Sequence, residues 1–109
     1  MDATGKRVLV VDDDAVLLRA VARELKAAGW EVKVATVAPI GGSEWAGIDV
    51  LLTDWEPGGE DALAVATYGN VPAVVMTGND ALVLPGVAIV RKPWQPGDLD
   101  SVLREAVRS

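Results

Sequence analysis

The chain has 109 residues, half of them hydrophobic and 24% charged, which suits one folded domain over residues 1–109 and excludes a disordered chain. Its formal net charge of −6 argues against nucleic-acid binding, which needs basic patches. The absence of cysteine excludes disulfides and thiolate sites, and the absence of histidine excludes the commonest general base and most transition-metal sites.

The sequence contains no membrane or export signal. No apolar run approaches the roughly 20 residues that span a bilayer. The first residues, MDATGKR, lack the apolar stretch of a signal peptide. We therefore expect a cytoplasmic protein that does not enter a membrane.

Five short aliphatic runs predict β-strands. They are Arg7–Val11, Glu31–Ala35, Val50–Thr53, Ala73–Thr77 and Val87–Val90. All but the second are nearly continuous in apolar residues, which is typical of parallel strands that are covered on both faces. The second run alternates charged and apolar residues, which predicts a half-exposed edge strand.

Two helices are clearly predicted. Asp14 is a good N-cap for the segment AVLLRAVARELKAA, which Gly29 ends. Its predicted apolar face consists of Leu17, Val21, Leu25 and Ala28. A last helix, expected to start near Pro96, has the apolar positions Leu99, Val102, Leu103, Ala106 and Val107.

The remaining connections are short. Residues 36–48 have room for at most one helical turn, residues 60–67 for a short helix, and residues 79–86 for barely a turn. Strands that alternate with helices predict an open parallel sheet with right-handed crossovers, and hence a three-layer α/β domain.

Charged and hydroxyl side chains follow several of these strands. In an open α/β sheet, ligands bind outside the carboxyl ends of the strands. Asp12, Asp13 and Asp54 would converge there, and each pair of carboxylates at about 4 Å would repel by roughly 1 to 4 kcal/mol. Without histidine or cysteine ligands, Mg²⁺, or Mn²⁺ as a substitute, is the expected counter-ion.

Two further residues complete a predicted phosphoryl site. Lys92 supplies a second positive charge and Thr77 a hydroxyl donor. A carboxylate that is surrounded by a cation, an ammonium and a hydroxyl can accept a phosphoryl group as an aspartyl phosphate. Asp54 is the predicted nucleophile.

The sequence resembles the receiver domain of response regulators, the phospho-acceptor domain of two-component signalling. The matching motifs are VLVVDDD at 8–14, DVLLTD at 49–54 followed by Pro57 and Gly58, VVMTG at 74–78, and RKPW at 91–94. They cover essentially the whole chain in the family's order. The resemblance implies a flavodoxin-like sheet with strand order 2-1-3-4-5, here with the second and fourth helices of the family shortened or lost.

The resemblance also assigns roles to single residues. Asp12 and Asp13 match the metal-binding acidic pair, and Asp54, which also contacts the metal, matches the phosphorylated aspartate. Thr77 matches the hydroxyl that engages the phosphoryl oxygen, and Lys92 the lysine that contacts it.

The implied function is Mg²⁺-dependent transfer of a phosphoryl group from a sensor histidine kinase or a histidine phosphotransfer protein to Asp54. Phosphorylation would then control binding of an unidentified downstream protein. Such a domain catalyses only its own phosphorylation, so we do not expect an enzyme. The family also implies a cis peptide bond between Lys92 and Pro93.

Three features depart from the family pattern. Ile89 replaces the tyrosine or phenylalanine that stands three residues before the lysine and turns inward on activation. The segment 78–91 is short, so the usual output face must differ. Glu56 and Asn79 occupy the positions that flank the phosphoryl group and tune its hydrolysis.

Three other classes of function fit the sequence less well. A non-phosphorylated interaction module would suit Ile89 and the short segment 78–91, but it would not require all five site residues. An aspartate-nucleophile phosphatase carries its nucleophile on the first strand and has a cap insertion. A dinucleotide-binding domain needs a glycine-rich turn where this chain has aspartates.

Asp14 is interpreted as a helix cap, and the four tryptophans as packing residues.

Overall fold

The computed structural model describes residues 6–40, 42–56 and 58–108. Nine elements follow one another along them. They are β1 (Arg7–Val11), α1 (Ala15–Ala27), β2 (Glu31–Ala35), the 3₁₀ turn η1 (Gly42–Trp45), β3 (Val50–Asp54), α2 (Gly59–Tyr68), β4 (Ala73–Thr77), β5 (Ala88–Arg91) and α3 (Asp98–Arg108).

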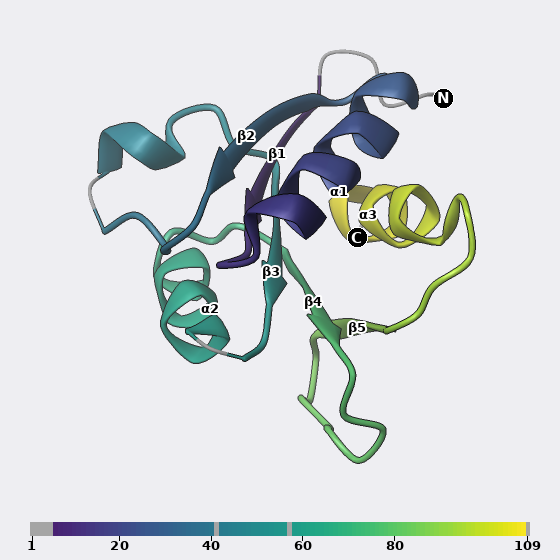
Figure 1. The fold of residues 1–109 in the computed structure, drawn as a ribbon. Coiled ribbons are helices and arrows are strands. Elements are labelled where there is room, and N and C mark those ends of the chain that lie inside the picture. The colour runs from purple at the N-terminus through teal and green to yellow at the C-terminus, as the bar shows by residue number, and fades with distance from the viewer. Residues whose placement is uncertain (1–5, 41, 57, 109) are drawn as a thin grey trace.

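The five strands form one parallel sheet in the order β2-β1-β3-β4-β5, as predicted (Figure 1). β1 and β3 lie in the middle and are buried along almost their whole length, which explains their continuous apolar runs. β2 lies at one edge and is half-exposed, so the prediction from its alternating sequence is confirmed.

The two faces of the sheet are covered unequally. α1 and α3 cover one face, where their side chains form the larger core cluster together with side chains from all five strands or their ends. α2 and η1 cover part of the other face over a smaller cluster, in which Ala62 and Ala66 of α2 pack on Leu9 and Leu51. Two helices on one face and one on the other give the three-layer α/β arrangement.

The helices differ slightly from the prediction. Val21 and Leu25 of α1 are buried and Leu17 and Ala28 half-buried, as expected, but Leu18 and Ala22 are buried as well. α3 begins at Asp98, two residues after Pro96, because Gly97 has a φ of 91°, outside the helical region.

The connections expected to be short are short. Between β2 and β3, the described residues form only η1 and irregular segments, and residues 78–87 between β4 and β5 contain no helix. No helix in the described ranges has the length and apolar character needed to cross a bilayer.

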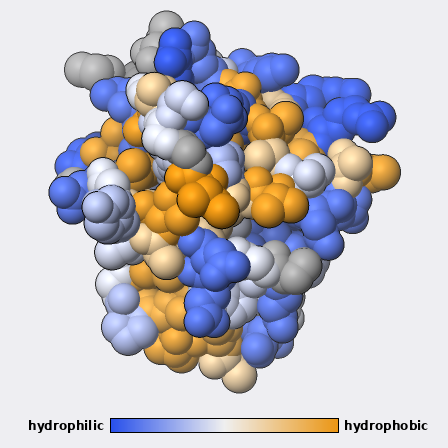
Figure 2. All heavy atoms as spheres, turned by 90° about the vertical axis from the view of Figure 1, so that its left-hand side faces the viewer, coloured by the Kyte–Doolittle hydropathy of each residue, from blue (hydrophilic) through white to orange (hydrophobic). Residues whose placement is uncertain are grey.

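The short connection after β2 leaves apolar side chains at the surface, as Figure 2 shows for that side of the molecule. Val37 and Ile40 are exposed there, beside a groove of about 500 Å³ between residues 36–40 and α2. The face of the sheet that α2 and η1 cover is therefore less completely covered than the face that α1 and α3 cover.

Candidate functional site

The carboxyl ends of β1 and β3 bring three aspartates together. Asp12 and Asp13 follow β1, and Asp54 is the last residue of β3. One carboxylate oxygen of each lies within 4.8 Å of one of each of the others. Asp12 and Asp54 are buried and Asp13 is exposed, so the acidic cluster opens to solvent on one side.

Asp12 is the most constrained of the three. Its backbone N–H donates to the carbonyl of Ala35 (3.1 Å), and its Oδ1 accepts from the N–H of Asp14 (2.8 Å). Its other oxygen, Oδ2, is buried and has no hydrogen-bond partner. Burial raises the pKa of Asp12 above its usual value, as do the Asp54 and Asp13 charges, against the opposing effects of the Asp14 N–H and of Lys92.

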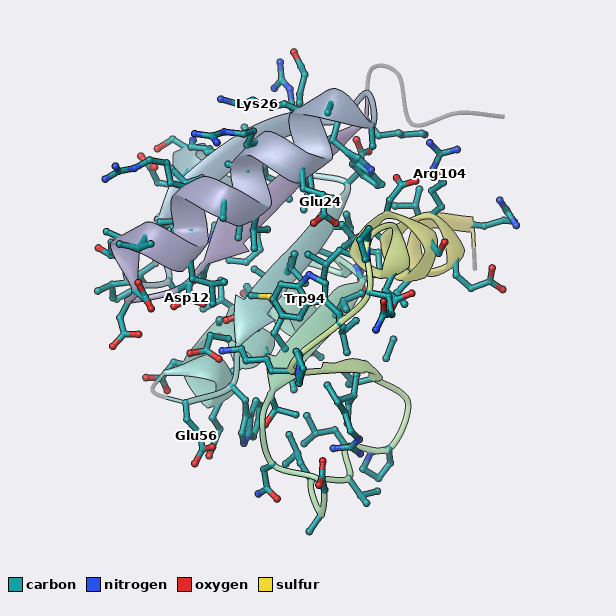
Figure 3. All side chains as sticks on the ribbon, turned by 45° about the vertical axis from the view of Figure 1, so that its right-hand side comes forward. Asp12, Glu24, Lys26, Glu56, Trp94 and Arg104 are labelled. Carbon is teal, nitrogen blue, oxygen red and sulfur yellow. The ribbon has the colours of Figure 1, made fainter. Side chains whose placement is uncertain are left out.

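Asp14 has a separate role, as the sequence predicted. Its Oδ1 accepts from the backbone N–H groups of Val16 (3.0 Å) and Leu17 (3.2 Å), so it caps the N-terminus of α1. The cap orients the first turn of α1 beside the acidic cluster. Figure 3 shows Asp12 below this end of the helix.

Lys92 balances part of the negative charge. Its Nζ donates to Asp54 Oδ1 at 2.9 Å, and both side chains are at least partly buried. The Lys92–Pro93 peptide bond is cis, as the resemblance implied. Trp94 follows and packs against the core between α3 and the sheet (Figure 3).

Thr77 lies at the end of β4, next to the end of β3. It is 2% exposed, and its carbonyl accepts from the backbone N–H of Lys92 at 2.7 Å. Its hydroxyl oxygen accepts from the N–H of Asn79 at 3.0 Å. The structure thus groups Asp12, Asp13, Asp54 and Lys92, and places Thr77 on the adjoining strand end with its hydroxyl bonded to the following loop.

Sequence reasoning missed the contacts of Arg91. Its guanidinium donates to the carbonyls of Asn79 (2.5 Å) and Leu82 (2.8 Å) in the loop after β4. From the sequence, Arg91 has no assigned role beyond its place in the RKPW motif. Alternation along a strand would have indicated that the two side chains leave it in opposite directions.

The start of α2 lies close to Asp54. Gly59 donates its N–H to the carbonyl of Trp55 (3.0 Å), and a Cβ at Gly59 would stand 2.6 Å from the Asp54 carbonyl oxygen. Glu56, two residues after Asp54, is exposed and projects beyond the end of β3 (Figure 3).

This arrangement suits a hard cation. Three carboxylates within 4.8 Å repel one another, and Lys92 bonds to only one of them. The unpartnered, buried Oδ2 of Asp12 is an acceptor for which a metal ion would supply the missing partner. Oxygen ligands alone favour Mg²⁺, Mn²⁺ or Ca²⁺ over zinc.

Comparison of the sequence with known families and with curated proteins finds no match. Comparison of the structure does. A response-regulator receiver domain protein from Clostridium thermocellum is 24% identical, with a TM-score of 0.78 over 94% of both chains. The chemotaxis response regulator CheY4 of Vibrio cholerae is 25% identical, with a TM-score of 0.76 over 93% of this chain and 98% of that one.

A third structure, a CheY-like response-regulator receiver domain protein from Methanospirillum hungatei, is 25% identical, with a TM-score of 0.73 over 94% of both chains. The strand order and the acidic cluster at the carboxyl ends of β1 and β3 agree with this similarity. Over nearly its whole length, therefore, the chain has the structure of a response-regulator receiver (CheY-like) domain.

Proposed function

We propose that this chain is the phospho-acceptor of a two-component phosphorelay. Asp54 would receive a phosphoryl group from a histidine of a sensor kinase or of a histidine phosphotransfer protein. The observation that supports this most directly is the environment of Asp54. Its carboxylate ends a central strand, lies in a cluster with Asp12 and Asp13, and is bonded to Lys92 at 2.9 Å.

The transfer would exchange one bond for another. A carboxylate oxygen of Asp54 forms the new P–O bond, and the P–N bond of the donor breaks with its electron pair going to the imidazole nitrogen. The product is an acyl phosphate on Asp54. Lys92 is already within hydrogen-bonding distance of Asp54, so it would contact the transferred group without a large rearrangement.

Asp12, Asp13 and Asp54 would hold Mg²⁺, which supplies positive charge to neutralise the transferred oxygens. The buried position of Asp12 and its bond from the Asp14 N–H keep one ligand fixed. The exposed Asp13 leaves the cluster open on the side from which a donor would approach. Thr77 would donate its hydroxyl proton to a phosphoryl oxygen, since its own oxygen already accepts from Asn79.

The modified domain would act as a signal carrier that does not turn over a substrate. Receiver domains are typically non-enzymatic, and the added charge on Asp54 would change the surface that a downstream protein binds. The residues that differ from the family pattern are expected to affect this output. Ile89 is half-buried in β5, where an aromatic side chain is usual.

The test is the intact mass after incubation with acetyl phosphate and Mg²⁺. We expect the wild type to gain one phosphoryl group, and we expect EDTA to prevent this gain. Asp54→Asn should gain none, whereas Asp61→Asn, a matched change at an exposed position of α2, should behave as the wild type. Labelling that persists in Asp54→Asn would contradict the assignment of the nucleophile.

A second candidate is a non-phosphorylated module that uses the same fold to bind a partner. The absence of a helix from residues 78–87 and the presence of Ile89 favour it. It predicts a folded protein that binds Mg²⁺ but gains no phosphoryl group from acetyl phosphate or from a phosphorylated histidine kinase.

A further inference from the structure

The loop between β4 and β5 has hydrogen bonds of its own, from the N–H groups of Ala81 and Leu82 to Asn79, and is also bonded to an arginine. Arg91, the last residue of β5, donates from one guanidinium nitrogen to the carbonyl of Asn79 and from another to the carbonyl of Leu82. Arg91 forms no ion pair with the carboxylates of the described residues, so its charge is directed to these two carbonyls. A planar guanidinium suits this contact because its donors are fixed in a fork.

The same loop residue also holds Thr77. The N–H of Asn79 donates to Thr77 Oγ1 at 3.0 Å, while the carbonyl of Asn79 accepts from Arg91. The two bonds form an unbroken connection from the Thr77 hydroxyl, through one residue, to the Arg91 guanidinium. A movement of the hydroxyl therefore requires Asn79 to move or to lose a bond.

Arg91 and Lys92 connect this loop to the site. Consecutive side chains at a strand end leave it in opposite directions. Lys92 reaches Asp54, and Arg91 reaches the loop. Their backbone is tied to Thr77, which pairs with Arg91 in the sheet and accepts from the Lys92 N–H. One pair of residues thus contacts both the acidic cluster and the loop.

We propose that Arg91 is a positioning residue for Thr77: through Asn79 it makes the hydroxyl and residues 78–82 move as one unit. If Asp54 is phosphorylated as proposed above, the same coupling has a role in signalling. When Thr77 turns to a phosphoryl group on Asp54, the Asn79 and Leu82 contacts of Arg91 rearrange. The exposed Val83 and the half-buried Leu82 and Leu84 then change their exposure, which supplies an output in place of a helix and an aromatic switch.

The coupling is tested first without phosphorylation. Amide hydrogen exchange is measured for residues 79–84 in Thr77→Val, in Arg91→Gln and in the double variant. We expect each single change to speed exchange at least about tenfold, as for the loss of one charge-assisted or buried hydrogen bond. The double variant should exchange little faster than either single one. Additive effects, or unchanged exchange in Arg91→Gln, would overturn the coupling.

Two control variants separate bridging from charge. Arg91→Lys keeps the charge but cannot bridge two carbonyls with a planar fork, so we expect its loop to exchange as fast as that of Arg91→Gln. Protection like that of the wild type in Arg91→Lys would overturn the bridging role. Arg19→Gln removes an exposed positive charge on α1 and should leave the loop unchanged.

The proposed role in signalling is tested with acetyl phosphate and Mg²⁺. Once intact mass shows the phosphoryl adduct, exchange at 79–84 should change in the wild type and should change much less in Arg91→Gln. Arg91→Gln should also form the adduct more slowly at unchanged Mg²⁺ affinity, which a loop with a merely structural role would not predict. An adduct with unaltered loop exchange overturns the signalling role and leaves the proposed function standing. A wild type that gains no adduct overturns the proposed function, while the double-variant experiment still decides the coupling.

Discussion

The two halves of the sheet's carboxyl edge are built differently. At the ends of β1 and β3, Asp12 and Asp54 are 2% and 8% exposed; Asp12 directly follows a central strand and Asp54 ends one. At the ends of β4 and β5, the loop residues 78–81 are exposed and are tied by the hydrogen bonds of Thr77 and Arg91 and by bonds within the loop. The acidic half depends on the core, and the other half depends on a few polar contacts.

The two proposed functions, metal binding and signalling, place different demands on these two halves. Ligands for a cation must stay in place, and burial in packed strands keeps them there. A segment that signals must have two arrangements of similar free energy, and exposed loops with few apolar contacts are where such arrangements are found. Four substitutions test whether the two halves differ in this way.

The largest expected effect is in the core that supports the acidic half. Leu52 is fully buried two residues before Asp54, in the cluster that α1 and α3 cover. Leu52→Ala should lower the free energy of unfolding by about 2–5 kcal/mol, because it leaves a cavity. Urea unfolding followed by tryptophan emission measures it. A loss under about 1 kcal/mol would mean that this half is not supported by the core.

The second effect concerns the metal. Asp13→Asn removes one of three clustered charges at an exposed position, so the fold should survive. We expect Mg²⁺ affinity to fall about tenfold or more, as the loss of one close charge implies. Calorimetric titration measures this change. Asn79→Ala, on the other half, should titrate as the wild type does. Equal losses in both variants would mean that the loop half contributes to metal binding as much as the acidic half does.

The third effect tests the cost of the Asp12 charge, which is buried and lies beside the charges of Asp54 and Asp13. Because the folded-state pKa of Asp12 is raised, its contribution to stability is present below the unfolded value, near 3.8, and is lost as pH rises through the folded value. Without metal, Asp12→Asn should therefore stabilise the protein by about 1 kcal/mol at neutral pH and by less in acid. Urea unfolding across this range checks it. With saturating Mg²⁺, the wild type should be the more stable of the two. A stabilisation by Asp12→Asn that does not change with pH would mean that the Asp12 charge is not its cause.

The smallest effect is on the loop. Val83 is 75% exposed, so Val83→Ser should change the free energy of unfolding by less than about 0.5 kcal/mol. The same urea experiment measures it. A cost similar to that of Leu52→Ala would show that the loop is part of the core.

The acidic half could be predicted from the sequence because it depends on buried strands. Continuous apolar runs predict buried parallel strands, and their carboxyl ends meet at one edge, so Asp12, Asp13 and Asp54 had to converge. The same geometry places Asp54, which accepts the hydrogen bond from Lys92, at this edge. The strand order and the cis Lys92–Pro93 bond were implied by the family resemblance.

The other half was less readable because no period describes it. The path of residues 78–87 is set by individual polar contacts, and an exposed arginine has many rotamers from which the sequence does not select. Likewise, α3 begins two residues after Pro96 because Gly97 adopts a positive φ, which could not be predicted from the presence of Pro96 before it. Leu18 and Ala22 were missed because α1 is covered over a wider arc than one narrow stripe.

Gly59 has a consequence for how this chain can vary. A Cβ there would stand 2.6 Å from the backbone oxygen of Asp54 and 2.9 Å from the Trp55 ring, closer than real Cβ atoms come. Any larger residue would therefore push the first turn of α2 away from the strand that carries Asp54. A library randomised at this codon and selected for phosphoryl acceptance should return glycine, although its backbone conformation there does not require one.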